Sequence, residues 1–286
     1  PGESSSVVGA PPEPIDSSAL AKATQSTMLR VLVHRLRVVL GRLGWRTRSL
    51  EEWERWHDPI VRRDVQRVVP YLPEEGSFLD IGANVGLFAK HLTEARPRAR
   101  GILFEPVRAY HERCAARFRG NPHVRVVHAA LGDEDRTATI YKAAHNPGAN
   151  SLMEDIMFDR RPNSMVSKDT VIEPEEVTLH HASHWLEREG ITHVDFIKSD
   201  TEGYDFAVLR GLVPWLERTG CRPVILVELL QESYHPRGAE QRAALAQLVA
   251  LGYAEVDLTQ LGGTVGDALL LPRTAGMELS ALARTE

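Results

Sequence analysis

Cysteine is nearly missing from this sequence. Only Cys114 and Cys221 occur among 286 residues, and neither belongs to a C-x-x-C pair or lies at a Cys/His ligand spacing. The sequence therefore argues against a fold held together by disulfide bridges or by a structural zinc ion. Two isolated cysteines fit a reducing compartment, so we expect a cytoplasmic protein.

A strong excess of one charge is also missing. The chain carries 34 Lys and Arg residues against 39 Asp and Glu residues, a net charge of −5. Nothing in this overall charge attracts nucleic acid, and we expect no nucleic-acid partner. No apolar run reaches the roughly 18 residues that a membrane-spanning helix requires. The composition, 43% hydrophobic and 26% charged, is that of an ordinary globular protein with one substantial core.

The N-terminal region differs in character from the rest. Residues 1–18 (PGESSSVVGAPPEPIDSS) offer little to bury and are predicted to be a disordered leader. Residues 19–70 are predicted to form a helical extension, with an amphipathic helix over Leu20–Leu43 and a second helix near Ile60–Val69. The first helix is interpreted as packing on the rest of the chain or on a second copy in a homodimer. The alternative is contact with a membrane surface through residues 20–48, which are basic and contain no acid.

Strands and helices alternate along residues 71–286, which predicts a mostly parallel sheet covered on both faces by helices. The strands are expected at Ser77–Ile81, Arg100–Phe104, Val124–His128, Thr137–Lys142, Val194–Lys198, Pro223–Leu229, Tyr253–Leu258 and Ala268–Pro272. The helices are expected at Leu87–Ala95, Val107–Phe118, Ala182–Glu189, Tyr204–Arg210 and Ala239–Leu251. The glycine-rich TQLGGTVG should join the last two strands in a hairpin, so that the final strand is antiparallel. Residues 143–177 show little periodicity and are predicted to be an irregular lid or substrate loop.

A glycine turn follows the first of these strands. Asp80, Gly82, Asn84 and Gly86 lie in a D-x-G-x-x-x-G spacing, and Glu105 ends the next strand. Two glycines before a helix, followed by an acid that can accept hydrogen bonds from both hydroxyls of a ribose, are typical of nucleotide-type sites. The G-x-G-x-x-G spacing that admits a pyrophosphate is absent. The turn therefore favours S-adenosylmethionine, which has a ribose and no phosphate, over a nicotinamide dinucleotide.

Val194–Gly211 (VDFIKSDTEGYDFAVLRG) resembles the FkbM-type methyltransferases, whose hallmark is close to D-F-I-K-x-D-x-E-G. FLDIGANVGLF, the tripeptide FEP, AALGDE and VILVEL support the resemblance in this order. The resemblance implies an α/β fold of the Rossmann-like class I methyltransferase kind, with a mostly parallel seven-stranded sheet whose last strand is antiparallel. It also implies S-adenosylmethionine as the cofactor and a hydroxyl of a natural product, glycan or lipid as the methyl acceptor.

One segment departs from that family. Where T-L-D-D is common, this sequence has Thr178-Leu179-His180-His181. Any catalytic or metal-binding role of the two acids cannot be carried over to these positions. We interpret His180 and His181, together with His184, as the partly exposed start of a helix without an acidic partner, rather than as a metal site.

Polar side chains near the carboxyl ends of the strands are the candidates for binding and chemistry, because ligands of parallel sheets bind there. Besides the glycine turn and Glu105, the expected cofactor contacts are Pro106, Ala130, Asp133 and Asp200. Asp133 alternatively shapes a turn, and Asp200 alternatively caps the following helix. The candidate bases that accept a proton from the acceptor hydroxyl are Asp200, Glu228 and His235. The candidate substrate contacts are Lys198, Glu202 and Ser151, and Lys198 is also expected to neutralise Asp200.

A divalent ion bridging Asp200, Glu202 or Glu228 would instead lower the pKa of the hydroxyl. We favour a reaction without a metal and assign no metal ligand. The sequence thus predicts an S-adenosylmethionine-dependent O-methyltransferase acting on a hydroxyl of a small natural product, such as a polyketide or a sugar. Three alternatives stay open: a glycan- or lipid-linked methyltransferase at a membrane surface, an N-methyltransferase, and a cofactor-binding regulator without turnover.

Overall fold

The computed structural model describes residues 49–144, 146–159, 166, 170–230, 236–257 and 267–273. The leader 1–18, the helix expected over Leu20–Leu43 and the candidate base His235 lie outside these residues. No helix in the described part of the chain is long and apolar enough to cross a membrane. The described residues belong to one compact unit.

A seven-stranded sheet with the strand order β10-β11-β9-β8-β1-β2-β3 forms the centre of this unit. Its strands are β1 (Ser77–Ile81), β2 (Arg100–Phe104), β3 (Val124–Val127), β8 (Phe196–Ser199), β9 (Val224–Glu228), β10 (Tyr253–Asp257) and β11 (Asp267–Pro272). β11 runs antiparallel to both β10 and β9, whereas the strands from β9 to β3 pair in parallel. The predicted sheet and its antiparallel last strand are confirmed.

The chain changes direction across the sheet at β1. From β1 it continues to β2 and β3 on one side, and it later returns to β8 and β9 on the other side. In open α/β sheets such a reversal leaves a crevice at the carboxyl ends of the two central strands, because the following connections diverge there. β1 and β8 are therefore the strands beyond which a ligand is expected.

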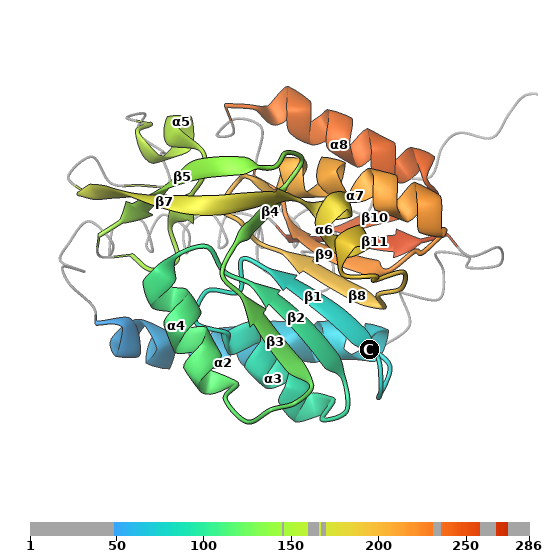
Figure 1. The fold of residues 1–286 in the computed structure, drawn as a ribbon, viewed down its shortest axis with the longest axis horizontal. Helices are drawn as coiled ribbons and strands as arrows, with labels where there is room; N and C mark the ends of the chain where they lie inside the picture. Colours follow the sequence, from blue (N-terminus) through green and yellow to red (C-terminus); the bar gives the residue numbers. More distant parts are fainter. Residues whose placement is uncertain are drawn as a thin grey trace, which may run out of the picture. The chain divides into compact units, whose positions relative to one another are not determined.

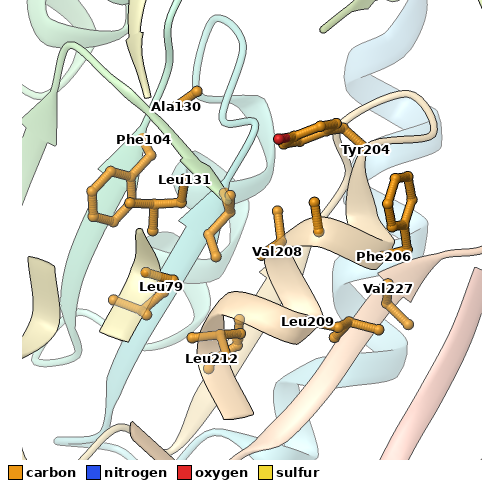
Figure 2. Packing of buried hydrophobic residues seen from close by; sticks show 14 of the residues in the cluster. Leu79, Phe104, Ala130, Leu131, Tyr204, Phe206, Val208, Leu209, Leu212 and Val227 are labelled. Atoms are coloured by element: carbon orange, nitrogen blue, oxygen red, sulfur yellow. The ribbon is translucent and has the colours of Figure 1, made fainter. Parts of the chain in front are cut away.

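Helices cover both faces of this sheet (Figure 1). One face carries α2 (Leu50–Val68), α3 (Leu87–Ala95) and α4 (Arg108–Arg117), and the other carries α6 (Ala182–Arg188), α7 (Asp205–Thr219) and α8 (Gly238–Ala250). Successive residues of β1 point to opposite faces, so Phe78 packs in the cluster under α2 and α3 while Leu79 packs in the cluster under α7. Figure 2 shows Leu79 in the same cluster as Val208 and Leu212 of α7.

A second, four-stranded sheet lies outside the main one and was not predicted. It has the order β4-β7-β5-β6, with β4 (Ala130–Gly132), β5 (Arg136–Ala143), β6 (Asn150–Ser151) and β7 (Ile172–His181). The expected strand Thr137–Lys142 thus belongs to this sheet. The prediction of an irregular segment over residues 143–177 was wrong in part, because β6, α5 (Glu154–Met157) and the start of β7 form within it.

α2 begins ten residues earlier than expected. Ser49 caps its first turn: its hydroxyl accepts from the backbone N–H of Glu52, and the Glu52 carboxylate accepts from the backbone N–H of Ser49, each at 3.2 Å. Ion pairs then fix α2 to its neighbours, from Glu54 to Arg113 and Arg117 of α4 at 2.7 and 2.8 Å. α2 is therefore a fixed wall of the compact unit.

Candidate functional site

A cavity of about 550 Å³ lies at the carboxyl ends of β1, β2, β8 and β9. This volume is within the range of small-ligand pockets. The sequence-predicted residues that line the cavity are Gly82, Asn84, Glu105, Pro106, Ala130, Lys198, Asp200, Glu202 and Glu228. Gly82 and Glu228 are 146 positions apart in the sequence, and the strand order brings all of these residues to one edge of the sheet.

The glycine turn is shaped by contacts with the protein itself. Gly82 has φ +78°, and a Cβ added there would lie 2.0 Å from the backbone oxygen of Asp200. Gly86 has φ +79°, and a Cβ there would meet Cys114 and Phe118 of the α4 region at 2.8 and 2.9 Å. Gly86 is not among the residues that line the cavity. The glycines therefore allow the residue after β8 and the α4 region to pack closely against the turn.

We expect Gly82→Ala to lower the free energy of unfolding by more than about 2 kcal/mol, because it adds a steric overlap to the cost of positive φ. Gly120→Ala is the control, since Gly120 has φ +89° but no atom within 4 Å of its added Cβ. It should cost only about 1–2 kcal/mol. Urea denaturation measures both. Equal losses in the two variants would show that the contact with Asp200 is not a constraint.

Glu105 joins the turn to the end of β2. Its two carboxylate oxygens accept from the backbone N–H groups of Asn84 at 2.7 Å and Val107 at 2.8 Å. The residue is 4% exposed. Burial raises its pKa to about 7, against the opposing effect of these two hydrogen bonds. Glu105 therefore holds the turn in shape, and its carboxyl group lies at the cavity wall, where it can accept further hydrogen bonds.

Lys198 lies beneath the cavity between two acids. Its ammonium is 3.2 Å from Asp80 and 3.2 Å from Asp200, and it donates to the backbone oxygen of Gly82 at 3.0 Å. Asp80 and Lys198 are register partners on β1 and β8. Burial alone would lower the pKa of Lys198, but the carboxylates of Asp200 and Asp80 outweigh it and hold this pKa well above its ordinary value. Lys198 is thus a fixed cation, and the expected pairing with Asp200 is present.

Three carboxylates meet at the ends of β8 and β9. Asp200, Glu202 and Glu228 each have an oxygen within 4.8 Å of the other two. Burial, and then repulsion from neighbouring carboxylates, raise the pKa of Glu202 and of Glu228 well above the ordinary value. Asp267 of β11 is the register partner of Glu228 and also lines the cavity. This side of the cavity is therefore strongly acidic.

Other predicted residues lie behind the cavity. The Ser151 hydroxyl is buried and donates to the backbone oxygen of Glu202 at 2.8 Å. Asp133 pairs with Arg210 of α7 at 2.6 Å. Neither side chain lines the cavity, and Asp80 is fully buried under Lys198. These residues support the site from outside it, and direct ligand contacts by them stay predictions.

Two interpretations from the sequence were wrong. Asp200 does not cap the following helix: α7 begins at Asp205, which itself accepts from the Ser199 hydroxyl at 2.5 Å and from the backbone N–H of Thr201 at 3.2 Å. The histidines do have an acidic partner, because Asp135 contacts His180 and His184 at 3.4 and 2.7 Å. His180 and His181 end β7 rather than begin a helix. β7 pairs with both β4 and β5, and Asp135 lies in the connection between those two strands, beside the histidines.

Sequence reasoning missed one wall of the cavity. Trp53 and His57 of α2 line it, with their rings stacked at 4.1 Å. Beside them Pro147 accepts from the side-chain amides of Asn84 and Asn150 at 2.7 and 2.8 Å. The capping box of α2 was the available sequence signal, because it marks a helix start just before Trp53.

One family model and several known proteins are similar to this chain. A family model described as the Methyltransferase FkbM domain matches residues 80–254. The AMB antimetabolite synthetase AmbE of Pseudomonas aeruginosa is 26% identical over 171 residues, which are 49% of this chain and 8% of AmbE. The chain thus spans a small part of this relative.

Among solved structures, a methyltransferase FkbM from Methylobacillus flagellatus is similar with 14% identity and a TM-score of 0.42, over 69% of this chain and 43% of that chain. The O-methyltransferase TomG from Streptomyces achromogenes is similar with 14% identity and a TM-score of 0.40, over 75% of this chain and 80% of that chain.

Proposed function

Because this chain belongs to the FkbM methyltransferase domain family, whose model matches more than half of it, we propose that it transfers a methyl group from S-adenosylmethionine to a hydroxyl oxygen of a small natural product. The observation that carries the proposal is the arrangement around Glu105. A buried acid that ends β2 holds the glycine turn by two backbone hydrogen bonds and lines the cavity at the switch point of the sheet.

The cofactor binds with its ribose hydroxyls on Glu105. Its adenine lies toward Ala130, and its sulfonium and ammonium groups lie toward the acidic side at Asp200. The charges support this orientation, because S-adenosylmethionine carries a net positive charge and Lys198 is the one Lys or Arg side chain among the described residues that line the cavity. The ammonium of Lys198 is already shared by two carboxylates.

Methyl transfer is an in-line displacement that requires alignment of the acceptor oxygen with the methyl carbon. Asp200 is placed for this task, because its side chain is 46% exposed at the end of β8 while Lys198 holds it from below. The hydroxyl must lose a proton during transfer, and carboxylates at hydrogen-bond distance act as acceptors in such steps. The similarity to a protein named as an antimetabolite synthetase supports a natural-product acceptor.

A transfer assay tests the proposal. The protein is incubated with methyl-labelled S-adenosylmethionine and with matched sets of hydroxylated compounds and amines. We expect label in a hydroxylated compound, and we expect Asp200→Asn to reduce the rate at least about tenfold while it still binds S-adenosylhomocysteine. Label only in amines would make the protein an N-methyltransferase. Cofactor binding without label in any compound would favour a regulator without turnover.

Cofactor affinity should rise with pH around neutrality. Glu105 has a pKa of about 7 in the free protein, and ribose hydroxyls donate to its ionised form, so binding releases a proton below pH 7. The association constant for S-adenosylhomocysteine should increase up to about tenfold between pH 6 and pH 8, and then level off. Calorimetry in buffers of different ionisation enthalpy measures this proton release. A constant affinity, or tighter binding at pH 6, would contradict the role of Glu105.

A further inference from the structure

Among the described residues that line the cavity, Asp200, Glu202 and Glu228 have fewer positive charges beside them than carboxylates. Their oxygens lie within 4.8 Å of one another, and among the described side chains that line the cavity only Lys198 is a Lys or Arg. Lys198 reaches Asp200 from below and also contacts Asp80. Asp267, the register partner of Glu228, adds another acid on the same side. Within the described part of the chain, one cation is thus set against several acids on this side of the cavity.

A second observation concerns Glu228 itself. Its Oε2 atom is completely buried and has no hydrogen-bond partner among the described residues, although the residue lines the cavity. The hydroxyl of Thr201, between Asp200 and Glu202, is also buried without a described partner. A buried carboxylate oxygen without a partner costs at least about 1–3 kcal/mol. Such orphaned oxygens in a native fold point to a bound group that satisfies them.

The donor set selects the kind of ion. It consists of carboxylate and hydroxyl oxygens without histidine or cysteine, which suits Mg²⁺ or Mn²⁺ and does not suit zinc. Two oxygens on opposite sides of a Mg²⁺ with bonds of about 2.1 Å are about 4.2 Å apart. Oxygens that already lie within 4.8 Å of one another need only small side-chain shifts to bind one ion.

We propose that Asp200, Glu202 and Glu228 bind one divalent cation, Mg²⁺ or Mn²⁺, and that the acceptor hydroxyl binds to the same ion. This inference rests on the proposed function and specifies its acceptor site. The three carboxylates fix the ion next to the methyl group, where it lowers the pKa of the hydroxyl. Because Asp200 binds the ion in this arrangement, the hydroxyl proton passes to water rather than to the Asp200 carboxylate. The alkoxide oxygen then bonds to the methyl carbon as the carbon–sulfur bond breaks, and its electron pair stays on the sulfur of S-adenosylhomocysteine.

Titration of Mn²⁺ into the metal-free chain of 286 residues, followed by the electron paramagnetic resonance signal of free Mn²⁺, tests the inference without turnover. We expect one Mn²⁺ per chain in the micromolar range, displaced by Mg²⁺. Glu228→Gln should lower the affinity for Mn²⁺ at least tenfold. Asp200→Asn serves as a second variant if Glu228→Gln does not fold. Glu112→Gln is the matched control, because Glu112 is exposed on α4.

Three outcomes would overturn the inference. The first is that no Mn²⁺ binds at millimolar concentration. The second is that Asp200→Asn and the control bind Mn²⁺ with equal affinity. The third is that Mg²⁺ displaces Mn²⁺ no better than Na⁺ does at the same concentration. Titration of S-adenosylhomocysteine into the same metal-free protein separates this failure from failure of the proposed function. Cofactor binding without Mn²⁺ binding leaves the methyltransferase and removes the ion, whereas Mn²⁺ binding without cofactor binding supports the ion site and contradicts the methyltransferase.

Discussion

We expect Lys198→Met to lower the free energy of unfolding by about 3–5 kcal/mol, because it leaves the buried carboxylate of Asp80 without its cation. Asp80 is fully buried and its only described cationic contact is the Lys198 ammonium at 3.2 Å. Urea denaturation at pH 7 measures the loss. The loss should shrink as the pH falls, because Asp80 in the variant takes up a proton in the folded state.

Lys90→Met is the matched control for this substitution. Lys90 also contacts two acids, Asp58 at 3.2 Å and Glu94 at 3.4 Å, but its side chain is 29% exposed. Its removal should cost no more than about 1 kcal/mol. A second control, Asp80→Asn combined with Lys198→Met, should recover part of the stability, since no unpaired charge is left in the core. Equal losses in Lys198→Met and Lys90→Met would contradict the structural role of the buried pair.

Glu105→Ala is expected to weaken the binding of S-adenosylhomocysteine more than about 100-fold. The substitution removes the acceptor for two ribose hydroxyls, and each hydrogen bond to a charged group is worth about 1.5–3 kcal/mol. It also frees the backbone N–H groups of Asn84 and Val107, so the turn loses its fixed shape. Isothermal titration calorimetry measures the change, and thermal denaturation of the free variant shows whether it is folded.

Glu112→Ala is the control for Glu105→Ala, because it removes the same side chain from an exposed position of α4. It should bind the ligand as the wild-type protein does. If folded Glu105→Ala binds the ligand with an affinity within about threefold of the control, the difference in binding free energy is less than about 0.7 kcal/mol. That result would place the ribose elsewhere in the cavity.

The main sheet was predictable because its strands carry local signals. FLDI, GILF and VILVE are short apolar runs, and each ends at a residue that lines the cavity or lies beneath it. Glu105 and the glycine turn were therefore found from the sequence. The sequence did not show why position 82 requires glycine, because the atom that a side chain there would meet belongs to the backbone of Asp200, more than 100 residues later. Close approach of distant segments leaves no local pattern.

β7 and the first ten residues of α2 were missed for different reasons. Of the ten residues of β7, only Val177 and Leu179 are fully buried, and Pro174 stands among glutamates. Its pairing with β5 comes from tertiary contact rather than from alternation. In α2, Pro59 stands inside the helix, a position that proline normally disfavours, so the local sequence favours a helix that begins after it. Because that helix start was missed, Trp53 and His57 were not predicted to line the cavity.

The distances within the cluster of Asp200, Glu202 and Glu228 were likewise not predictable from the sequence. Asp200 and Glu202 are near neighbours in the sequence, and Glu228 ends another strand, so all three were candidates. Their separation of less than 4.8 Å, and the presence of Asp267 beside Glu228, follow from the pairing of β8, β9 and β11. The sequence predicted the residue types at this edge, and the fold determines their distances.

A crystal structure of the protein with S-adenosylhomocysteine tests the central claim most directly. The account predicts the ligand in the cavity at the ends of β1 and β8, with both ribose hydroxyls within hydrogen-bond distance of Glu105 and the sulfur facing Asp200. A ligand bound outside this cavity, or bound in it with the ribose away from Glu105, would contradict the account.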